Sequence, residues 1–377
     1  MSIPAKPLIV LAAGGTGGHV FPAEALASEL LNRSCRLALI TDRRGGNFSG
    51  VLGGLETYRI RAGGVAGKGI VTLLQSGLEL ICGLFQARRL LKRLMPSAVV
   101  GFGGYASVPT MFAAGSLGLP TAIHEQNAIL GRANRFLAPR VRRIATCFDI
   151  TDGVPASATE KVTITGMPVR PAIVAARHFT YGERSIDGDE ALFRLLVIGG
   201  SQGARVLSDI VPQAMGALGA GLRRRLRVVQ QCRPEDIERV RAVYAQYNID
   251  AELRTFFNDV STYLGAASLI VARAGASTVA ELTAVGRPAI LVPYSYAIDD
   301  HQSSNAHAIN EAGAGWVLPE SSLTAGALKS RVESLVEMPA ILQRTAANAR
   351  NLGRPEAAKA LADMVLDLVS SDERKVA

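Results

Sequence analysis

Short apolar runs recur along the chain, and each leads into a glycine-containing turn and then into a stretch with helical spacing of apolar residues. The clearest runs are residues 8–13, 98–102, 195–198 and 269–272. Apolar runs of this length that end in turn signals suit buried strands, and strands that alternate with helices are typical of a parallel sheet. The pattern therefore predicts an α/β fold built from strand–turn–helix units.

One predicted helix has an apolar stripe at residues 70, 73, 74, 78, 81 and 85, with polar residues opposite and basic residues after it. The ordinary interpretation is a helix packed on its sheet with a solvated basic face. The alternative is a membrane-surface patch, because basic residues beside exposed apolar ones are attracted to anionic lipid. The candidate patch consists of Ile70, Leu73, Leu74, Ile81, Phe85, Arg88 and Arg89.

Length and composition indicate two domains. A chain of 377 residues can bury two separate cores, and a hydrophobic fraction of 48% with 38 glycines argues against disorder. The strand and glycine turn at 195–203 echo those at 8–18. We expect a first domain at 1–165, a hinge and linker at 166–190, a second domain at 191–354, and a C-terminal helix at 355–377 that packs back on the first domain.

Cysteine usage and the N-terminus suggest a cytoplasmic protein. The four cysteines are far apart and form no CxxC pair, so we expect reduced thiols and no metal site. The N-terminus enters a strand without the features of a secretion signal. No uncharged apolar run reaches the roughly 20 residues of a membrane-spanning helix, so a soluble or peripheral protein is expected.

The basic excess lies in the first half of the chain. Residues 1–165 contain 18 Lys and Arg against 9 Asp and Glu, whereas residues 166–377 contain 23 of each. A basic surface suits nucleic acid, an anionic membrane or a phosphorylated substrate. Nucleic acid is disfavoured, because the basic residues are not interleaved with aromatic stacking platforms.

Residues 271–302 contain the most informative chemistry. A strand breaks at Gly275 and a helix follows, with Ser277 or Thr278 expected at the N-cap. Such a helix start can hold a diphosphate without a lysine. Glu281 lies one turn further on, where its carboxylate could bind a ribose diol, and the polar loop that ends at Gln302 suits sugar hydroxyls. The alternative is an ordinary βαβ unit with a solvated Glu281.

The first glycine loop superficially suggests a dinucleotide site, because Asp42 ends the second predicted strand. The GxGxxG fingerprint fails, since counting from Gly15 places Val20 at its third glycine position. A nicotinamide or flavin site is therefore disfavoured.

Five ordered motifs carry a family resemblance: GGTGGH at 14–19, GFGGY at 101–105, HEQN at 124–127, GGSQGA at 199–204 and ARAGASTVAE at 272–281. In these motifs the chain resembles the MurG glycosyltransferases. Two stretches depart from the family pattern, at Val108-Pro109-Thr110 and at Met167, where the family usually has asparagine.

The resemblance implies a GT-B fold, with two doubly wound Rossmann-like domains and the active site in the interdomain cleft. It implies inverting transfer of GlcNAc from UDP-GlcNAc to the 4-hydroxyl of undecaprenyl-pyrophosphoryl-MurNAc-pentapeptide (lipid I), giving lipid II and UDP without a cofactor. It also implies a peripheral enzyme on the cytoplasmic face of the bacterial inner membrane, with a role in cell-wall synthesis, cell shape and division, and with other cell-wall synthesis proteins as possible partners.

The resemblance also implies roles for individual residues. His19 would be the general base, with Glu125 as the competing candidate. The implied donor-binding residues are Thr16, Gly17, Gly18, Asn127, Arg170, Ser201, Phe257, Ala276, Ser277, Thr278, Glu281 and Gln302. The implied acceptor-binding residues are Gly14, Gly15, Gly103, Gly104 and Tyr105.

Two rival functions share parts of this pattern. A UDP-GlcNAc 2-epimerase would use the same donor but no lipid acceptor. A membrane-bound protein that only senses the nucleotide sugar would bind the donor without turnover.

Overall fold

The computed structural model describes residues 6–14, 17–42, 48, 50–63, 70–182, 192–200 and 203–376. The chain divides into two compact units. The first unit comprises Met1–Arg170 together with Glu356–Ala377, and the second comprises Pro171–Pro355. Gly15, Thr16 and Ser201, three of the predicted site residues, lie outside the described residues.

The first unit contains a seven-stranded parallel sheet. In spatial order its strands are β3 (Glu56–Ile60), β2 (Arg36–Asp42), β1 (Leu8–Ala12), β4 (Ala98–Gly101), β5 (Thr121–Glu125), β6 (Arg143–Thr146) and β7 (Val162–Ile164). The strand order reverses between β1 and β4, and α/β sheets usually bind ligands at the carboxyl ends of the strands beside such a reversal. The apolar runs did not reveal β3 and β6, because both strands contain charged residues and neither ends in a glycine turn.

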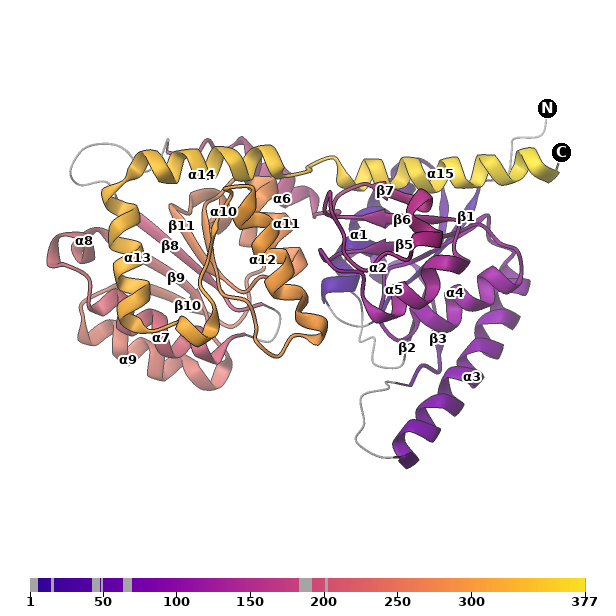
Figure 1. Ribbon diagram of the computed structural model, residues 1–377, viewed down its shortest axis with the longest axis horizontal. Coiled ribbons are helices and arrows are strands. Elements are labelled where there is room, and N and C mark those ends of the chain that lie inside the picture. The colour runs from indigo at the N-terminus through magenta and orange to yellow at the C-terminus, as the bar shows by residue number, and fades with distance from the viewer. Residues whose placement is uncertain are drawn as a thin grey trace. The chain divides into compact units, whose positions relative to one another are not determined.

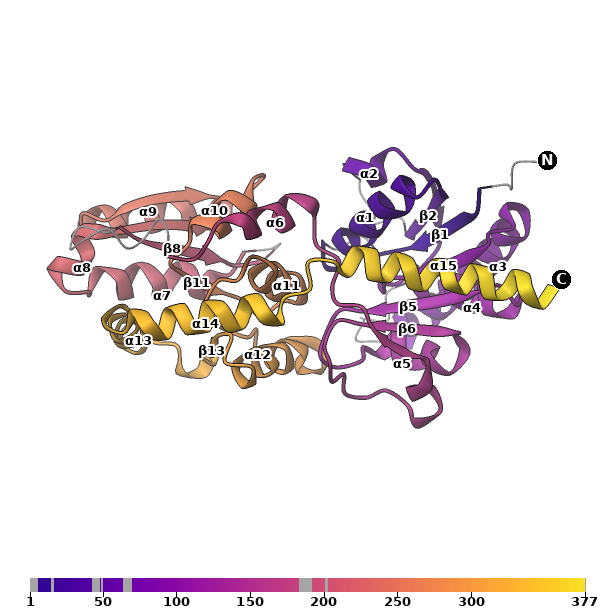
Figure 2. The same cartoon turned by 90° about the horizontal axis from the view of Figure 1, so that it is seen from above.

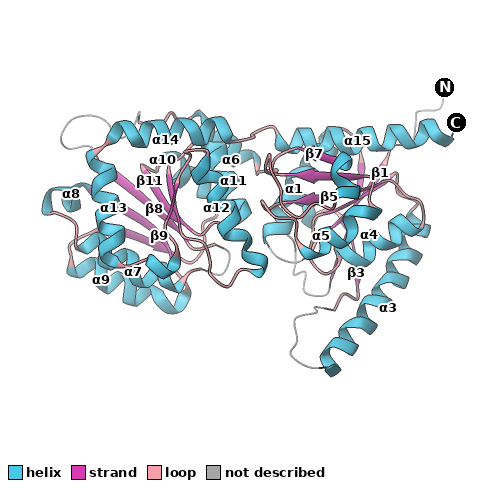
Figure 3. Ribbon diagram, viewed as in Figure 1, coloured by secondary structure: helices cyan, strands magenta, loops and turns pink. Residues whose placement is uncertain are grey.

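Helices flank this sheet (Figure 1, Figure 3). They are α1 (Gly17–Asn32), α2 (Gly50–Gly53), α3 (Ile70–Leu94), α4 (Ser107–Ser116), α5 (Arg132–Leu137) and α15 (Ala357–Val376), with 3-10 segments η1 (Ala138–Arg140) and η2 (Ala156–Lys161). The C-terminal α15 lies along the first unit beside α1 (Figure 2). Leu361, Ala362 and Val365 of α15 join the core that Leu26 and Leu30 of α1 occupy.

The start of α1 differs from the sequence-based expectation. Apolar spacing suggested a helix from residue 22, but α1 begins at Gly17 and contains Pro22. Pro22 has no N–H to donate to the Gly18 carbonyl, so α1 lacks one hydrogen bond between its first and second turns. His19 therefore lies in the first turn of a helix.

The helix α3 contradicts the ordinary interpretation of its apolar stripe. The buried face of α3 consists of the small residues Ser76, Gly83 and Ala87, followed by Leu90 and Leu91 near the C-terminal end of the helix. The described residues of the stripe are instead in solvent, with Leu78 63%, Ile81 53% and Phe85 67% exposed. The side chains of Ile70, Leu73 and Leu74 lie outside the described part of the structure. Small residues allow close packing here, since a Cβ on Gly83 would lie 1.9 Å from the carbonyl oxygen of Arg61.

The second unit contains a six-stranded parallel sheet of the same winding. Its strands, in spatial order, are β10 (Asp250–Arg254), β9 (Leu226–Gln231), β8 (Phe193–Ile198), β11 (Leu269–Ala272), β12 (Ala289–Leu291) and β13 (Trp316–Val317). The order reverses between β8 and β11. Both units are thus doubly wound α/β folds, as the family resemblance implied.

The helices of the second unit cover both faces of this sheet (Figure 3). They are α6 (Pro171–Ala175), α7 (Arg205–Gly216), α8 (Ala220–Arg225), α9 (Ile237–Gln246), α10 (Val260–Ala266), α11 (Ala276–Val285), α12 (His301–Glu311), α13 (Ala325–Glu337) and α14 (Pro339–Leu352). The 3-10 segments are η3 (Ala176–His178), η4 (Pro234–Asp236), η5 (Ile298–Asp300) and η6 (Glu320–Ser322).

Two arginines, Arg287 and Arg177, connect the first residues of the second unit to α10 and α11 by hydrogen bonds. The Arg287 guanidinium donates to the carbonyl oxygens of Leu264, Gly265 and Phe179 at 3.1, 2.6 and 2.8 Å. Arg177 donates in the same way to Ala284 at 2.7 Å, in the last turn of α11. Residues 171–182 are therefore bound tightly to α10 and α11, although their sequence suggested part of a linker.

Candidate active site

The first two glycine loops touch at the carboxyl ends of β1 and β4. The Gly14 amide donates to the Gly103 carbonyl at 3.1 Å. A Cβ on Gly104 would lie only 2.6 Å from the Gly14 Cα, and Gly103 and Gly104 have φ values of +94° and +78°. Larger residues would separate the two loops, so glycine is required here for close backbone approach.

His19 lies beside this contact. The ring is half-buried, and a Cβ on Gly103 would lie 2.7 Å from its Nε2 and Cδ2 atoms. Gly103 therefore makes room for the imidazole as well as for Gly14. The structure brings the GGTGGH and GFGGY motifs together around one histidine.

His124 is a buried structural residue. Burial lowers its pKa to about 4, opposed by a hydrogen bond to the Gly166 carbonyl and assisted by the charge of His19. The Nδ1 atom lies 3.1 Å from Gln126 Nε2, and Nε2 lies 3.3 Å from the Gly166 oxygen. These contacts suit a neutral ring protonated at Nε2. His124 and Gln126 therefore belong to a buried hydrogen-bond network inside the first unit.

Glu125 is the last residue of β5, although the sequence suggested that HEQN is a loop after the strand. Its carboxylate is buried and accepts four hydrogen bonds. The donors are Asn127 N at 3.0 Å, Asn127 Nδ2 at 3.1 Å, Gly131 N at 2.9 Å and Asn134 Nδ2 at 2.8 Å. Glu125 therefore shapes the segment 127–134 from within the protein.

The turn after β7 brings Arg170 onto α1. The Arg170 guanidinium lies 4.8 Å from the ring centroid of Phe21, two residues after His19. Met167 is buried, so the residue that replaces the family's asparagine packs into the interior. Tyr105, in the loop after β4, and Asn127, just after β5, are half-buried.

In the second unit, α11 starts two to three residues earlier than expected. Gly275 is the N-cap, so Ser277 and Thr278 lie inside the first turn, and the prediction that one of them is the N-cap is wrong. The Ser277 Oγ is buried and has no hydrogen-bond partner among the residues that the structure describes. A buried hydroxyl without a partner, beside the free amides of a helix start, suits an anionic ligand.

Two residues that sequence reasoning left without a role hold this turn in place. The buried Arg273 donates to the carbonyl oxygens of Val292 and Pro293 at 3.3 and 3.1 Å and to Glu320 at 2.6 Å. Asn305, on α12, donates to the Ala274 carbonyl at 3.1 Å. The available signal was a charged residue at the end of an apolar strand, which must find partners when it is buried.

The remaining donor candidates surround α11 and α12. Glu281 is half-buried, one turn after Ser277 on α11. Gln302 lies in the first turn of α12, and its Oε1 accepts from the Tyr294 amide at 3.0 Å. Phe257 is buried, with its ring centroid 5.1 Å from that of Tyr263, so only its backbone is available to a ligand.

Comparisons with known proteins, by family model, by sequence and by structure, agree on the family of this chain. The models for the glycosyltransferase family 28 N-terminal and C-terminal domains match residues 9–146 and 194–361. The chain is 58% identical, over 97% of its length and 98% of the relative's, to the UDP-N-acetylglucosamine–N-acetylmuramyl-(pentapeptide) pyrophosphoryl-undecaprenol N-acetylglucosamine transferase of Paramagnetospirillum magneticum. The enzyme of the same name from Rhodospirillum rubrum is 55% identical, over 95% of this chain and 91% of that one.

The chain belongs to the MurG family of glycosyltransferases. Among solved structures, Acinetobacter baumannii MurG is 30% identical, has a TM-score of 0.77 and covers 96% of this chain and 99% of that one. The family resemblance and the GT-B fold class are thereby confirmed. None of the helices in the described part of the MurG-family chain is long and apolar enough to span a membrane.

Proposed function

We propose that this protein transfers GlcNAc from UDP-GlcNAc to the 4-hydroxyl of the MurNAc residue of lipid I, with inversion at the anomeric carbon. The observation that carries the proposal is the start of α11 in a chain 58% identical to a MurG-family transferase. There the Ser277 hydroxyl, which has no hydrogen-bond partner among the described residues, and the helix amides suit a diphosphate. The products are lipid II and UDP.

In the proposed reaction the lipid I hydroxyl oxygen attacks the anomeric carbon while the bond from that carbon to the UDP oxygen breaks. His19 takes the hydroxyl proton, so the new glycosidic bond forms without a build-up of positive charge. The departing UDP carries the electron pair of the broken bond. Its added negative charge must be stabilised by groups that are already in place.

On the second unit, those groups are the α11 amides, Ala276, Ser277 and Thr278, with help from Ser201. Glu281 would accept hydrogen bonds from the ribose hydroxyls, because it lies one helical turn beyond the phosphate position. The backbone at Phe257 would contact the uracil. The Oε1 of Gln302 is occupied by the Tyr294 amide, which leaves its NH2 group to donate to a GlcNAc hydroxyl.

The first unit would supply the acceptor side. Gly14, Gly15, Gly103 and Gly104 bring backbone amides near the lipid I diphosphate, and Tyr105 would border it. Thr16, Gly17, Gly18 and Asn127 would close on the transferred sugar, with Arg170 near the donor phosphates. The packing of Gly14 against Gly104 supports this assignment, because it requires the absence of side chains on both loops.

Between the two candidates for the base, the geometry favours His19. Glu125 is 1% exposed and its carboxylate oxygens already accept four hydrogen bonds. A substrate hydroxyl could approach it only by displacing these donors. His19 is half-buried, whereas Glu125 is buried, and the His19 ring lies beside the contact between the two glycine loops.

We also propose that the exposed face of α3 holds the protein on the cytoplasmic leaflet of the inner membrane. Leu78, Ile81 and Phe85 project into solvent, and Arg89 and Lys92 continue the same helix face. An exposed apolar cluster beside basic residues suits an anionic bilayer, to which each Lys or Arg adds about 1 kcal/mol.

The neighbouring elements extend this face. Arg88 hydrogen-bonds to Ser116 at the end of α4. The half-exposed rings of Phe112 and Phe136 stack with centroids 6.2 Å apart, and the Arg140 guanidinium lies 4.6 Å from the Phe136 ring. Aromatic rings with a cationic neighbour are suited to the headgroup region.

Replacing both Ile81 and Phe85 by serine is expected to lower partitioning onto vesicles that contain phosphatidylglycerol at least about 10-fold, since burial of one such side chain contributes roughly 1.5–3 kcal/mol. Both residues are exposed, so the melting temperature should not change. Vesicle sedimentation measures the effect. Ile150→Ser is the control, because Ile150 is exposed in the same unit but is not on α3. Equal binding of the double variant and the wild type would contradict the membrane assignment.

Release of UDP from UDP-GlcNAc, measured with and without lipid I, tests the proposed reaction. We expect release that depends on lipid I, together with a β-linked disaccharide product. Acceptor-independent release accompanied by ManNAc would identify an epimerase instead. Donor binding without any release would identify a sensor.

A further inference from the structure

We propose that Arg233, Asp236 and Arg239 form a positioning network for the glycine loop that follows β8, and that this network holds the two ends of the loop, Gly199–Gly200 and Gly203, in the position needed for the donor diphosphate. The inference rests on the proposed function, in which this loop helps to bind the donor. None of the three residues belongs to the five motifs of the family resemblance.

The ends of the loop are held by the strand next to it. The Gly199 amide donates to Gln231 Oε1 at 3.2 Å, and Gln231 Nε2 donates onward to the Thr255 carbonyl at 3.3 Å. Gly203 donates to the Gly200 carbonyl at 3.0 Å, with φ values of +71° and +85° at these two glycines. The described ends of the loop are therefore joined to each other by the Gly203–Gly200 hydrogen bond, and Gly199 is joined to the end of β9.

Arg233 supports the far end of this turn. A Cβ on Gly203 would lie 2.5 Å from the Arg233 Cγ, so the alkyl chain of the arginine packs directly on the glycine backbone. An arginine side chain loses conformational entropy when it is held against a backbone, and this loss opposes the packing. Arg233 can therefore support the backbone only if other contacts already restrain its conformation.

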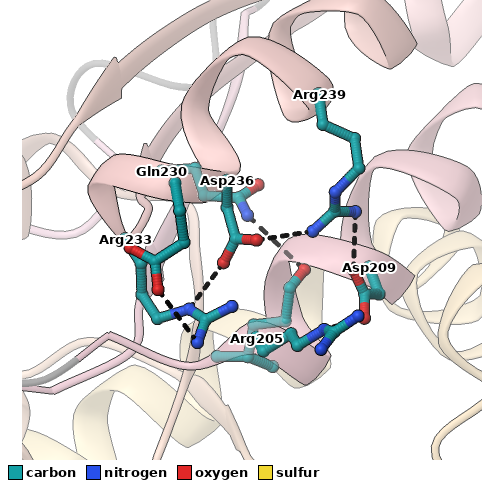
Figure 4. A network of polar contacts seen from close by, with 8 residues as sticks. Arg205, Asp209, Gln230, Arg233, Asp236 and Arg239 are labelled. Atoms are coloured by element: carbon teal, nitrogen blue, oxygen red, sulfur yellow. Dashed lines mark hydrogen bonds and ion pairs between the residues drawn. The ribbon is translucent and has the colours of Figure 1, made fainter.

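Asp236 provides that restraint (Figure 4). It lies just before α9, its side chain is buried, and its two oxygens accept from Arg233 Nε and Arg239 Nη2, both at 2.7 Å. The hydrogen bond from Arg233 lowers the pKa of Asp236, with a further contribution from Arg239. A carboxylate bonded on both sides by guanidinium groups fixes the orientation of each.

The outer part of the network returns to the loop. Arg239 pairs with Asp209 on α7, and Asp209 lies 3.6 Å from the Arg205 guanidinium (Figure 4). Arg205 is the first residue of α7, and one residue, Ala204, separates it from the loop. The chain of contacts therefore begins under Gly203 and ends at the exit of the same loop.

The charges of the network balance. Three arginines face three carboxylates, the third being Glu235, 3.2 Å from Arg233. A neutral cluster has little electrostatic attraction for a diphosphate, so its contribution must come from position. An electrostatic role and a positioning role predict opposite effects on diphosphate binding when Asp236 is neutralised. Neutralisation leaves an extra positive charge, which would strengthen binding in an electrostatic role, whereas loss of positioning would weaken it.

The test is Asp236→Asn in the full-length protein. We expect KM for UDP-GlcNAc to rise about 5–20-fold with kcat within about 2-fold of wild type, which is part of the roughly 10–100-fold loss that a whole charged hydrogen bond to the substrate would give. The inhibition constant of UDP should rise similarly, whereas that of uridine, which has no diphosphate, should stay unchanged. This difference between UDP and uridine separates positioning of the loop from general destabilisation.

Glu238→Gln is the matched control, because it removes one carboxylate from the first turn of the same helix outside the network. If Asp236→Asn does not fold, Arg239→Gln, which keeps the Asp236–Arg233 pair, should shift the UDP constant in the same direction by less. Unchanged or tighter UDP inhibition, or equal loss for UDP and uridine, would overturn the inference. If Glu281→Ala also leaves donor binding unchanged, the failure belongs to the proposed donor site instead.

Discussion

Replacing His19 by alanine is expected to lower kcat for lipid II formation by about 10²–10⁴-fold, the usual contribution of a positioned general base. The KM for UDP-GlcNAc should change little, because His19 acts on the acceptor hydroxyl in the proposed mechanism. Since the ring is half-buried in the first turn of α1, the melting temperature should stay close to that of the wild type. Steady-state kinetics with lipid I and UDP-GlcNAc measure the effect.

Two further variants make this result specific. His307→Ala removes an exposed imidazole from α12 and should leave kcat unchanged. Glu125→Gln replaces an acceptor oxygen by an amide that faces backbone and side-chain donors, so it should lower the melting temperature, each unsatisfied buried donor costing about 1–3 kcal/mol. Retained activity in His19→Ala, or a stable Glu125→Gln protein without activity, would transfer the base role to Glu125.

Replacing Glu281 by alanine is expected to raise the KM for UDP-GlcNAc about 10–100-fold, because hydrogen bonds to a charged group contribute roughly 1.5–3 kcal/mol. The kcat at saturating donor should remain near that of the wild type, since the ribose is remote from the reacting carbon. Donor titration at fixed lipid I gives both constants. Glu281→Gln keeps one acceptor oxygen and should lie between the two.

Glu311→Ala is the control for this experiment, because it removes an exposed carboxylate at the end of α12 in the same unit. Its kinetic constants should match those of the wild type. An unchanged KM in Glu281→Ala would show that the ribose is bound elsewhere, and the phosphate assignment at Ser277 would then need separate proof by inhibition with UDP.

Much of the fold could be predicted because its strands are short, apolar and followed by glycine turns. The strand at 269–272 and its glycine turn occur where the pattern predicted them. The strands β3 and β6 could not be found in this way, since ETYRI and RIAT mix charged and apolar residues. Their place in the sheet depends on pairing with distant strands, which local sequence does not encode.

The sequence supplied candidate residues for the site but not the contacts among them. The motifs identified His19, Glu125 and Glu281 as candidates, yet only the structure distinguishes the half-buried His19 from the fully bonded Glu125. The supporting residues Arg273 and Asn305 could not be assigned from sequence, because their partners lie 19 to 47 positions away.

The sequence by itself determined the alternation of strands and helices and the five ordered motifs, since these depend on local patterns of residues, and the motifs carried the family resemblance that implied two doubly wound domains. The tertiary structure decided which face of α3 is buried, which carboxylate is already bonded, and which side chains support the ends of the glycine loop after β8. The physical reason is that burial is a property of the whole packed chain. An apolar stripe or a carboxylate has the same local sequence whether its partner is the core or solvent.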